Sequence, residues 1–155
     1  MRFWPRFKKS TLLKWMSYWP PFFGAGIRIR EISDDFTLVR VEMKLRFWNR
    51  NYVGTHFGGS LYSMVDPFYM LMLIENLGRD YIVWDKAASI RFLKPGRGRV
   101  SAEFRLSEQD LVSVKDRVSE AGKTQAEFVV QVRDDSGTVI SEISKTIYIR
   151  KKSRG

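Results

Sequence analysis

The residues that could perform chemistry in this chain are concentrated in one stretch, NYVGTHFGGSLYSMVDPF, at residues 51–68. It contains the only histidine, His56, then a glycine pair, Gly58 and Gly59, and then an acid, Asp66, within an apolar segment. The first turn of a helix has backbone N–H groups without intrahelical partners, and these carry a partial positive charge. A helix that begins at the glycines would therefore attract an anion, or the oxyanion that develops during acyl transfer.

Two interpretations of the glycine pair are open. Glycine lets a ligand approach the backbone of a helix start closely, but the same pair could serve only to turn the chain or to admit a neighbouring element. Ser60 is expected to be an ordinary helix-start residue, because GGSLY lacks the G-x-S-x-G spacing of a serine hydrolase. The glycines therefore indicate either backbone chemistry or close packing.

Asp66 is difficult to explain by structure alone. A carboxylate in a mostly apolar helix is costly unless it is paired, hydrogen-bonded or protonated, which favours a use in catalysis. The structural alternative is that Asp66 braces a kink at Pro67, whose ring interrupts the regular hydrogen bonding of a helix.

The spacing of these residues predicts an oligomer. Asp66 follows Gly59 by seven positions, which puts the two on nearly the same helix face but roughly 10 Å apart along the axis. One copy cannot easily place both on a single carbonyl. We therefore predict a homo-oligomer, a dimer or a dimer of dimers, in which a second copy supplies the acid across a two-fold axis.

The rest of the sequence predicts the elements that position this stretch. Apolar residues at helical spacing over residues 12–19, followed by Pro20 and Pro21, predict a short N-terminal helix. Residues 59–77 also follow helical spacing but are apolar on every face, which predicts a long helix buried in the core. Alternation of apolar and polar residues predicts strands at residues 26–33, 36–47, 99–107, 123–134 and 138–151. A further strand should end before a Pro-Gly turn near residue 95, and residues 107–118 should form a short helix or turn.

These elements predict a single α+β domain over residues 1–155, with a core from about residue 10 to 149. DDSG at 134–137 has hairpin chemistry, so the sheet should be largely antiparallel. One long buried helix wrapped by one curved antiparallel sheet, with an N-terminal helix, is the natural way to bury the apolar faces.

Composition narrows the classes of function. Of the 155 residues 44% are hydrophobic, which is typical of a globular domain, and cysteine is absent, which excludes disulfides and thiolate nucleophiles. One histidine without cysteine predicts no metal site, and no motif indicates a cofactor. No secretory signal or transmembrane segment is recognisable, so we expect a cytoplasmic protein.

The net charge, 27 minus 17 or +10, would attract phosphate-bearing partners. Nucleic acid, anionic lipid, coenzyme A and a merely solvated surface all fit the charge. We predict no nucleic-acid partner, because the outward face of the second strand mixes Glu42 with Arg40, Lys44 and Arg46. The aromatic and basic N-terminus fits a membrane interface, but also packing over the sheet or lining an acyl pocket; its residues are Trp4, Trp15, Trp19, Phe22, Phe23, Arg6, Lys8, Lys9 and Lys14.

A family resemblance adds to this reading. NYVGTHFGGSLYSMVD resembles the signature of hotdog-fold acyl-CoA thioesterases of the phenylacetate-pathway type. More closely, GTHFGGSLYSMVDPFYMLML, WDKAASIRFLKPGRG and WPPFFGAGIRI resemble the thioesterase-like hotdog family DUF4442, over about residues 10–149. The resemblance implies a hotdog fold and hydrolysis of an acyl thioester.

The resemblance also implies roles for single residues. Asn51 matches the family's asparagine, Gly58 and Gly59 its glycine pair, and Asp66 its catalytic acid. The thioester carbonyl would rest on the N–H of Gly59 or a neighbour, Asp66 of the partner copy would attack or activate water, and Asn51 would orient that water or the substrate. The chain departs from the motif where Phe57 replaces the family's histidine; His56 comes one place earlier.

This departure keeps two functions open. The first is hydrolysis of acyl-CoA, with coenzyme A as part of the substrate and no separate cofactor; the second is a non-catalytic acyl-CoA or lipid binder. His56 is expected either to take part in catalysis or to be structural, and Asn49 either to take part or to brace its loop. Coenzyme A phosphates would meet a basic cluster, for which a solvated hairpin is the alternative; its residues are Arg91, Lys94, Arg97 and Arg99.

Overall fold

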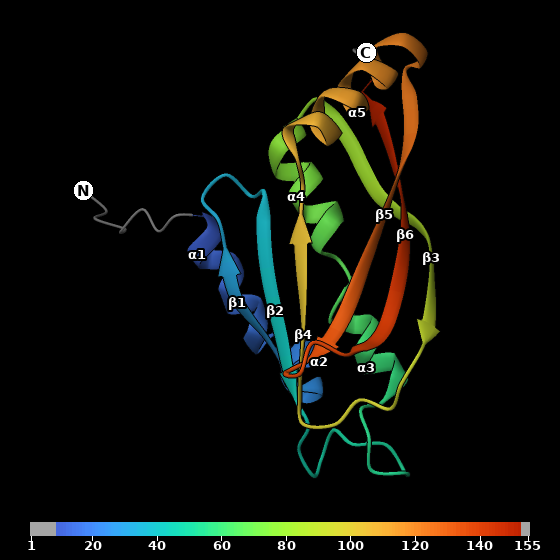
Figure 1. Ribbon diagram of the computed structural model, residues 1–155. Coiled ribbons are helices and arrows are strands. Elements are labelled where there is room, and N and C mark those ends of the chain that lie inside the picture. Colours follow the sequence, from blue (N-terminus) through green and yellow to red (C-terminus); the bar gives the residue numbers. More distant parts are fainter. Residues whose placement is uncertain (1–8, 153–155) are drawn as a thin grey trace, which may run out of the picture.

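The computed structural model describes residues 9–152, so Trp4, Arg6 and Lys8 of the N-terminal segment lie outside the described residues. Six strands form one antiparallel sheet in the order β1-β2-β4-β5-β6-β3 (Figure 1). The strands are β1 (Ile27–Ile32), β2 (Leu38–Lys44), β3 (Tyr81–Phe92), β4 (Arg99–Arg105), β5 (Lys123–Asp134) and β6 (Val139–Lys151).

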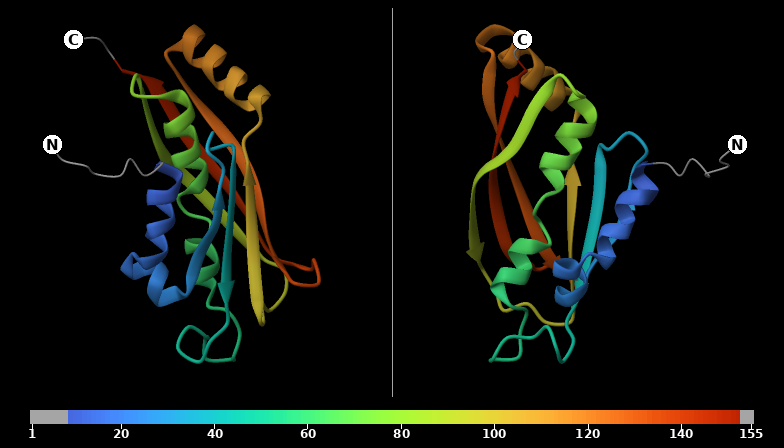
Figure 2. Two further views of the ribbon diagram at one scale, coloured as in Figure 1. Left: turned by 90° about the vertical axis from the view of Figure 1, so that its left-hand side faces the viewer. Right: turned by 180° about the vertical axis from the view of Figure 1, so that it is seen from behind.

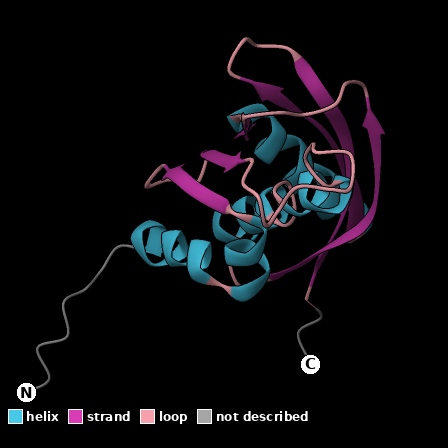
Figure 3. Ribbon diagram, turned by 90° about the horizontal axis from the view of Figure 1, so that it is seen from below, coloured by secondary structure: helices cyan, strands magenta, loops and turns pink. Residues whose placement is uncertain are grey.

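The alternating residues of the strands divide between a core face and a solvent face. On β2, Val39, Val41 and Met43 are buried, whereas the intervening Arg40 is exposed. Seen from below, the sheet curves around the helices that lie against its inner face (Figure 3). The α+β architecture predicted from the apolar faces, a buried helix inside a curved antiparallel sheet, is therefore confirmed.

The long helix predicted over residues 59–77 is present as two segments. α3 (Gly58–Ser63) and α4 (Phe68–Leu77) are joined by a turn that contains Asp66 and Pro67. Phe68, Met72 and Leu73 of α4 are fully buried against the sheet. Because proline cannot continue the helical hydrogen bonding, the interruption occurs where the structural interpretation of Asp66 placed a kink.

The N-terminal region is longer and differently divided than predicted. It consists of α1 (Lys9–Lys14), the 3₁₀ helix η1 (Trp15–Tyr18) and α2 (Pro20–Ala25). The helical segment predicted over residues 12–19 does end before the prolines, at Tyr18. Pro20 and Pro21 then begin the additional helix α2, because proline fits the first turn, where no backbone N–H donor is needed. These short helices lie along the β1 side of the sheet (Figure 2).

Two connections also bear on the sequence predictions. The hairpin expected at DDSG is present between β5 and β6, where Asp134 Oδ1 accepts hydrogen bonds from the N–H groups of Ser136 and Thr138, each at 2.9 Å. Residues 107–118 form more than a short helix: α5 (Glu108–Ala121) begins at Ser107, whose side chain and that of Asp110 form a reciprocal cap. Among residues 9–152, no helix is both long and apolar enough to cross a membrane.

Candidate active site

The start of α3 borders a cavity of about 550 Å³. Phe57 precedes the helix in an extended conformation and its side chain makes no capping hydrogen bond. The backbone of Gly59 is exposed and that of Gly58 partly exposed. The cavity brings together several predicted site residues, namely Asn51, His56, Gly58, Lys94 and Arg97. Gly59 and Asp66 do not line it.

A side chain at either glycine would meet an aromatic ring. A Cβ atom on Gly58 would lie 2.9 Å from the ring of Phe92, and one on Gly59 would lie 2.5 Å from the ring of Phe57. The pair therefore admits two aromatic rings, which was one of the two interpretations of the sequence. The close approach does not exclude the other, because the same missing side chains leave the first turn of α3 open to a ligand.

Asn51 and His56 hold the loop that leads into α3. Asn51 Oδ1 accepts hydrogen bonds from the backbone N–H groups of Val53 and Thr55, and its Nδ2 donates to Thr55 Oγ1 at 2.9 Å. His56 is buried, and its Nε2 lies 3.0 Å from the carbonyl oxygen of Gly98. These contacts fasten the loop to the turn that follows β3 and so fix where α3 begins.

His56 has one ring nitrogen without a partner. With Nε2–H donating to Gly98, its Nδ1 is a buried acceptor with no hydrogen bond among residues 9–152. Burial lowers the pKa of His56, while the hydrogen bond to Gly98 opposes the change. A neutral imidazole beside the cavity is therefore favoured. Asn49, also considered for the site, is a loop brace: its Nδ2 donates to the carbonyl oxygens of Ala25 and Lys44.

The basic cluster predicted for coenzyme A is divided by the structure. Lys94 and Arg97 line the cavity. Arg99 Nε donates to Asp135 Oδ1 at 3.0 Å, and Arg91 lies 3.6 Å from Glu142. Lys94 and Arg97 are therefore the members of the cluster that are placed beside the start of α3.

Asp66 belongs to a cluster of charged residues that the sequence reasoning missed. Lys145 of β6 has only 1% of its side chain exposed, and its Nζ donates to Asp66 Oδ1 at 2.9 Å. The same Nζ forms an ion pair with Asp85 of β3 at 3.0 Å. The Asp66 side chain is 43% exposed and that of Asp85 21%. One buried ammonium thus joins two carboxylates, of which Asp66 is the more accessible.

The pKa values of the cluster reflect its burial and mutual contacts. Burial raises the pKa of Asp85, and the neighbouring Asp66 carboxylate adds to this, while Lys145 opposes it. Burial alone would lower the pKa of Lys145, but its bonds to Asp66 and Asp85 outweigh burial, so that its pKa is raised. Lys145 is therefore charged at neutral pH and holds Asp66 in place.

A signal for Lys145 is present in the sequence. Ile143, Ile147 and Ile149 of β6 are fully buried at every second position, and Lys145 occupies the same register. A lysine in a buried register requires an acid within reach. Asp85 lies at a register shift in the pairing of β3 with β6, where one extra residue on β3 changes the direction in which the neighbouring side chains point.

Residues 9–149 match a family described as a domain of unknown function, DUF4442. The chain belongs to the DUF4442 family. No curated protein matches it.

Solved structures show the fold of this DUF4442 protein. A protein from Pseudomonas aeruginosa described as a probable thioesterase of unknown function superposes with a TM-score of 0.80, at 20% identity over 92% of this chain and 95% of that one. A thioesterase from Haemophilus influenzae superposes with a TM-score of 0.68, at 12% identity over 99% and 100% of the two chains. The fold is therefore the hotdog fold of thioesterases.

Proposed function

We propose that this DUF4442 protein hydrolyses acyl thioesters, with acyl-CoA as the substrate class. The observation that carries the proposal is Asp66: a partly exposed carboxylate, held by the buried Lys145, that follows the glycine start of the same broken helix. Thioester hydrolysis requires a base or nucleophile and a donor for the developing oxyanion. The fold shared with thioesterases supports this assignment.

The proposed site is shared between two copies. β3 is an edge strand of 12 residues that pairs only with β6 among residues 9–152. Ala87, Ala88 and Ser89 on it are exposed, and such an uncovered edge is a template for another strand. Pairing of β3 with β3 of a second copy would form a two-fold dimer beside Asp85 and Asp66.

In this dimer each residue has a defined task. Gly58 or Gly59 of one copy donates a backbone N–H to the thioester oxygen, and Asp66 of the other copy takes a proton from water. The hydroxide forms a bond to the carbonyl carbon, the C–S bond breaks, and the protonated Asp66 gives its proton to the departing sulfur, which leaves as the free thiol. One backbone donor of this kind is worth about 3 kcal/mol in the transition state.

Binding of the coenzyme A portion is assigned to the cavity. Lys94 and Arg97 would pair with its phosphates, and Asn51 keeps the loop beside the helix start in shape. Arg91 and Arg99 contribute less, because each already has an acidic partner. Lys145 and Asp85 act as positioning residues, since they reach the substrate only through Asp66.

One observation favours a second function, the binding of acyl-CoA or lipid without turnover. Phe57 stands where the thioesterase motif that the chain resembles has a histidine, and Asp66 is already engaged by Lys145. An acid that never leaves its ammonium would not activate water.

Release of free thiol from short, long and aryl acyl-CoAs distinguishes the two functions. We expect turnover in at least one class, and a decrease of about 100-fold to 10,000-fold for Asp66→Asn, the range for loss of a general base. Asp116→Asn, on the exposed face of α5, is the matched control and should retain full activity. Binding without turnover across the panel would establish the second function, and activity that survives in Asp66→Asn would reject the mechanism.

A further inference from the structure

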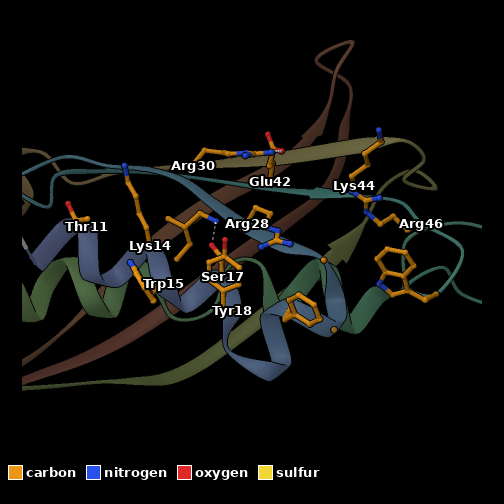
Figure 4. A pocket seen from close by; sticks show the side chains of 15 residues that line it. Thr11, Lys14, Trp15, Ser17, Tyr18, Arg28, Arg30, Glu42, Lys44 and Arg46 are labelled. Carbon is orange, nitrogen blue, oxygen red and sulfur yellow. Dashed lines mark hydrogen bonds and ion pairs between the residues drawn. The ribbon is translucent and has the colours of Figure 1, made fainter. Parts of the chain in front are cut away.

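A second, larger hollow lies on the opposite side of the molecule from β3. It is a groove of about 1050 Å³ between the N-terminal helices and the outer face of β1 and β2 (Figure 4). We call it the cationic–aromatic groove, and it uses none of the residues assigned to catalysis. Because β1 and β3 are the two edges of the sheet, a dimer formed through β3 leaves this groove uncovered.

Charge is strongly unbalanced along the groove. Five basic residues and one acid line it, and the acid, Glu42, is paired with Arg30. The remaining cations come from different elements but face the same hollow; they are Lys14, Arg28, Lys44 and Arg46. Such a surface attracts anions at close range and over roughly 8–10 Å at ordinary ionic strength.

Large aromatic side chains are exposed around these cations. Trp15 is 69% exposed, Phe47 78% and Trp48 54%, and Tyr18, Trp19 and Phe23 also have more than half of their surface in solvent. Exposed aromatic surface of this extent is unusual for a soluble domain and marks a place of interaction. Tryptophan and tyrosine with arginine and lysine are the residues that proteins place at the interface between lipid acyl chains and headgroups.

The groove is held in shape by buried polar contacts. Ser17 is buried, and its Oγ accepts the backbone N–H of Ile29 at 2.9 Å, which fixes η1 to the edge strand β1. Asn49 Nδ2 donates to the carbonyl oxygen of Ala25, which joins the 46–49 loop to α2. The tryptophans of both segments are therefore presented from a fixed backbone.

The arginines already cover several of the ring faces. Arg28 lies over the rings of Tyr18 and Phe23, with its guanidinium carbon 5.3 and 5.8 Å from the ring centres, and Arg46 lies 5.2 Å from the centre of the Trp48 ring. Single-stranded nucleic acid needs free ring faces on which bases stack. A lipid interface does not, because there the rings insert by their edges and the guanidinium groups meet phosphates.

We propose that the cationic–aromatic groove docks the protein on the surface of an anionic lipid bilayer. The groove cations bind lipid phosphates, and the exposed rims that carry Trp15 and Trp48 insert among the headgroups. Docking requires no thioester, so it stands independently of the proposed hydrolysis. It brings the protein to the water–lipid boundary.

Sedimentation with vesicles tests this proposal. One set contains phosphatidylcholine alone, and the other equal parts of phosphatidylcholine and phosphatidylglycerol. We expect wild type to sediment with the anionic vesicles and not with the neutral ones, and to release with added salt. Removing two groove cations in Lys14→Glu/Lys44→Glu should weaken binding at least about 30-fold. Lys115→Glu/Lys123→Glu, on α5 and β5, makes the same change in net charge and should bind as wild type.

A second pair of variants separates insertion from general charge attraction. Trp15→Ala/Trp48→Ala keeps every charge and should weaken vesicle binding about tenfold or more, since each ring loses its burial in the interface. The proposal is overturned if the groove variants bind vesicles as wild type does or if both charge pairs lose binding equally. It is also overturned if the groove variants change the oligomeric state in light scattering, or lose binding to a single-stranded oligonucleotide but not to vesicles.

Discussion

Replacement of Lys145 by methionine should destabilise the protein in a pH-dependent way. The substitution removes the cation between Asp66 and Asp85 while keeping the length of an apolar side chain. Loss of one partner from a buried ion pair costs about 3–5 kcal/mol. The Asp66 side chain is 43% exposed, so solvent screens its share, and the lower end of this range applies. We therefore expect a loss of about 3 kcal/mol in the free energy of unfolding, or about 6–12 °C in Tm for a domain of this size.

The pH dependence follows from Asp85. Its pKa is already raised in wild type, by burial and by Asp66, and loss of Lys145 would raise it further. An acid with a raised pKa in the folded state binds protons there before the unfolded chain does, so stability increases as pH falls through that pKa. The deficit of Lys145→Met should therefore be largest near neutral pH and shrink as pH falls toward the ordinary aspartate value of about 3.9.

Urea unfolding followed by tryptophan fluorescence at a series of pH values measures both effects. Because His56 titrates in both proteins, its contribution cancels in the difference between variant and wild type. Lys145→Met combined with Asp85→Asn should recover at least about 1 kcal/mol, since the carboxylate left without a cation is removed. The reasoning is refuted if Lys145→Met is as stable as wild type, or if its deficit does not change with pH.

Three further predictions concern the helix start, the histidine and the edge strand. Gly59→Ala should push the Phe57 ring across the start of α3, so that the rate of thiol release falls about tenfold or more. The free energy of unfolding in urea should change by under about 1 kcal/mol, because the Phe57 ring is exposed and can move. The pKa of His56 is lowered, so wild type should lose stability as pH falls from about 6.5 toward the pKa in the folded state, and His56→Gln should lack this decline in urea titrations. Ala87→Lys/Ser89→Lys should convert a dimer to a monomer in light scattering, because charges on an edge strand oppose strand pairing; an unchanged mass would contradict pairing through β3.

Much of the fold follows from periodicity in the sequence. The alternation of apolar and polar residues along β2 predicted its buried face, with Val39, Val41 and Met43, and the apolar segment after Gly59 predicted the central helix. These patterns are local, so they can be read from one segment at a time. The end of the helical segment before Pro20 could also be predicted locally, whereas α2 was missed, because proline both interrupts a helix interior and fits the first turn of a new helix.

The candidate site was only partly accessible to the same reasoning. Asp66 was singled out because an acid in an apolar helix needs a partner, but its partner, Lys145, is 79 residues away. Only the pairing of β6 with β3, and the packing of both against the broken helix, brings Lys145 to Asp66 and Asp85. Likewise, Arg99 looked equivalent to Lys94 along the chain until the fold gave it an acidic neighbour.

Complementation between two variants tests the shared active site most directly. Asp66→Asn lacks the acid and Gly59→Val blocks the helix start, so each should be inactive by itself in thiol release from an acyl-CoA that wild type hydrolyses. Unfolding and refolding the two together gives mixed dimers in which one of the two sites has both an intact Asp66 and an intact Gly59. The account predicts recovery of about one quarter of wild-type activity, since half of the dimers are mixed and each has one working site. Mixed dimers that form, as seen by mass spectrometry, and yet stay inactive would contradict it.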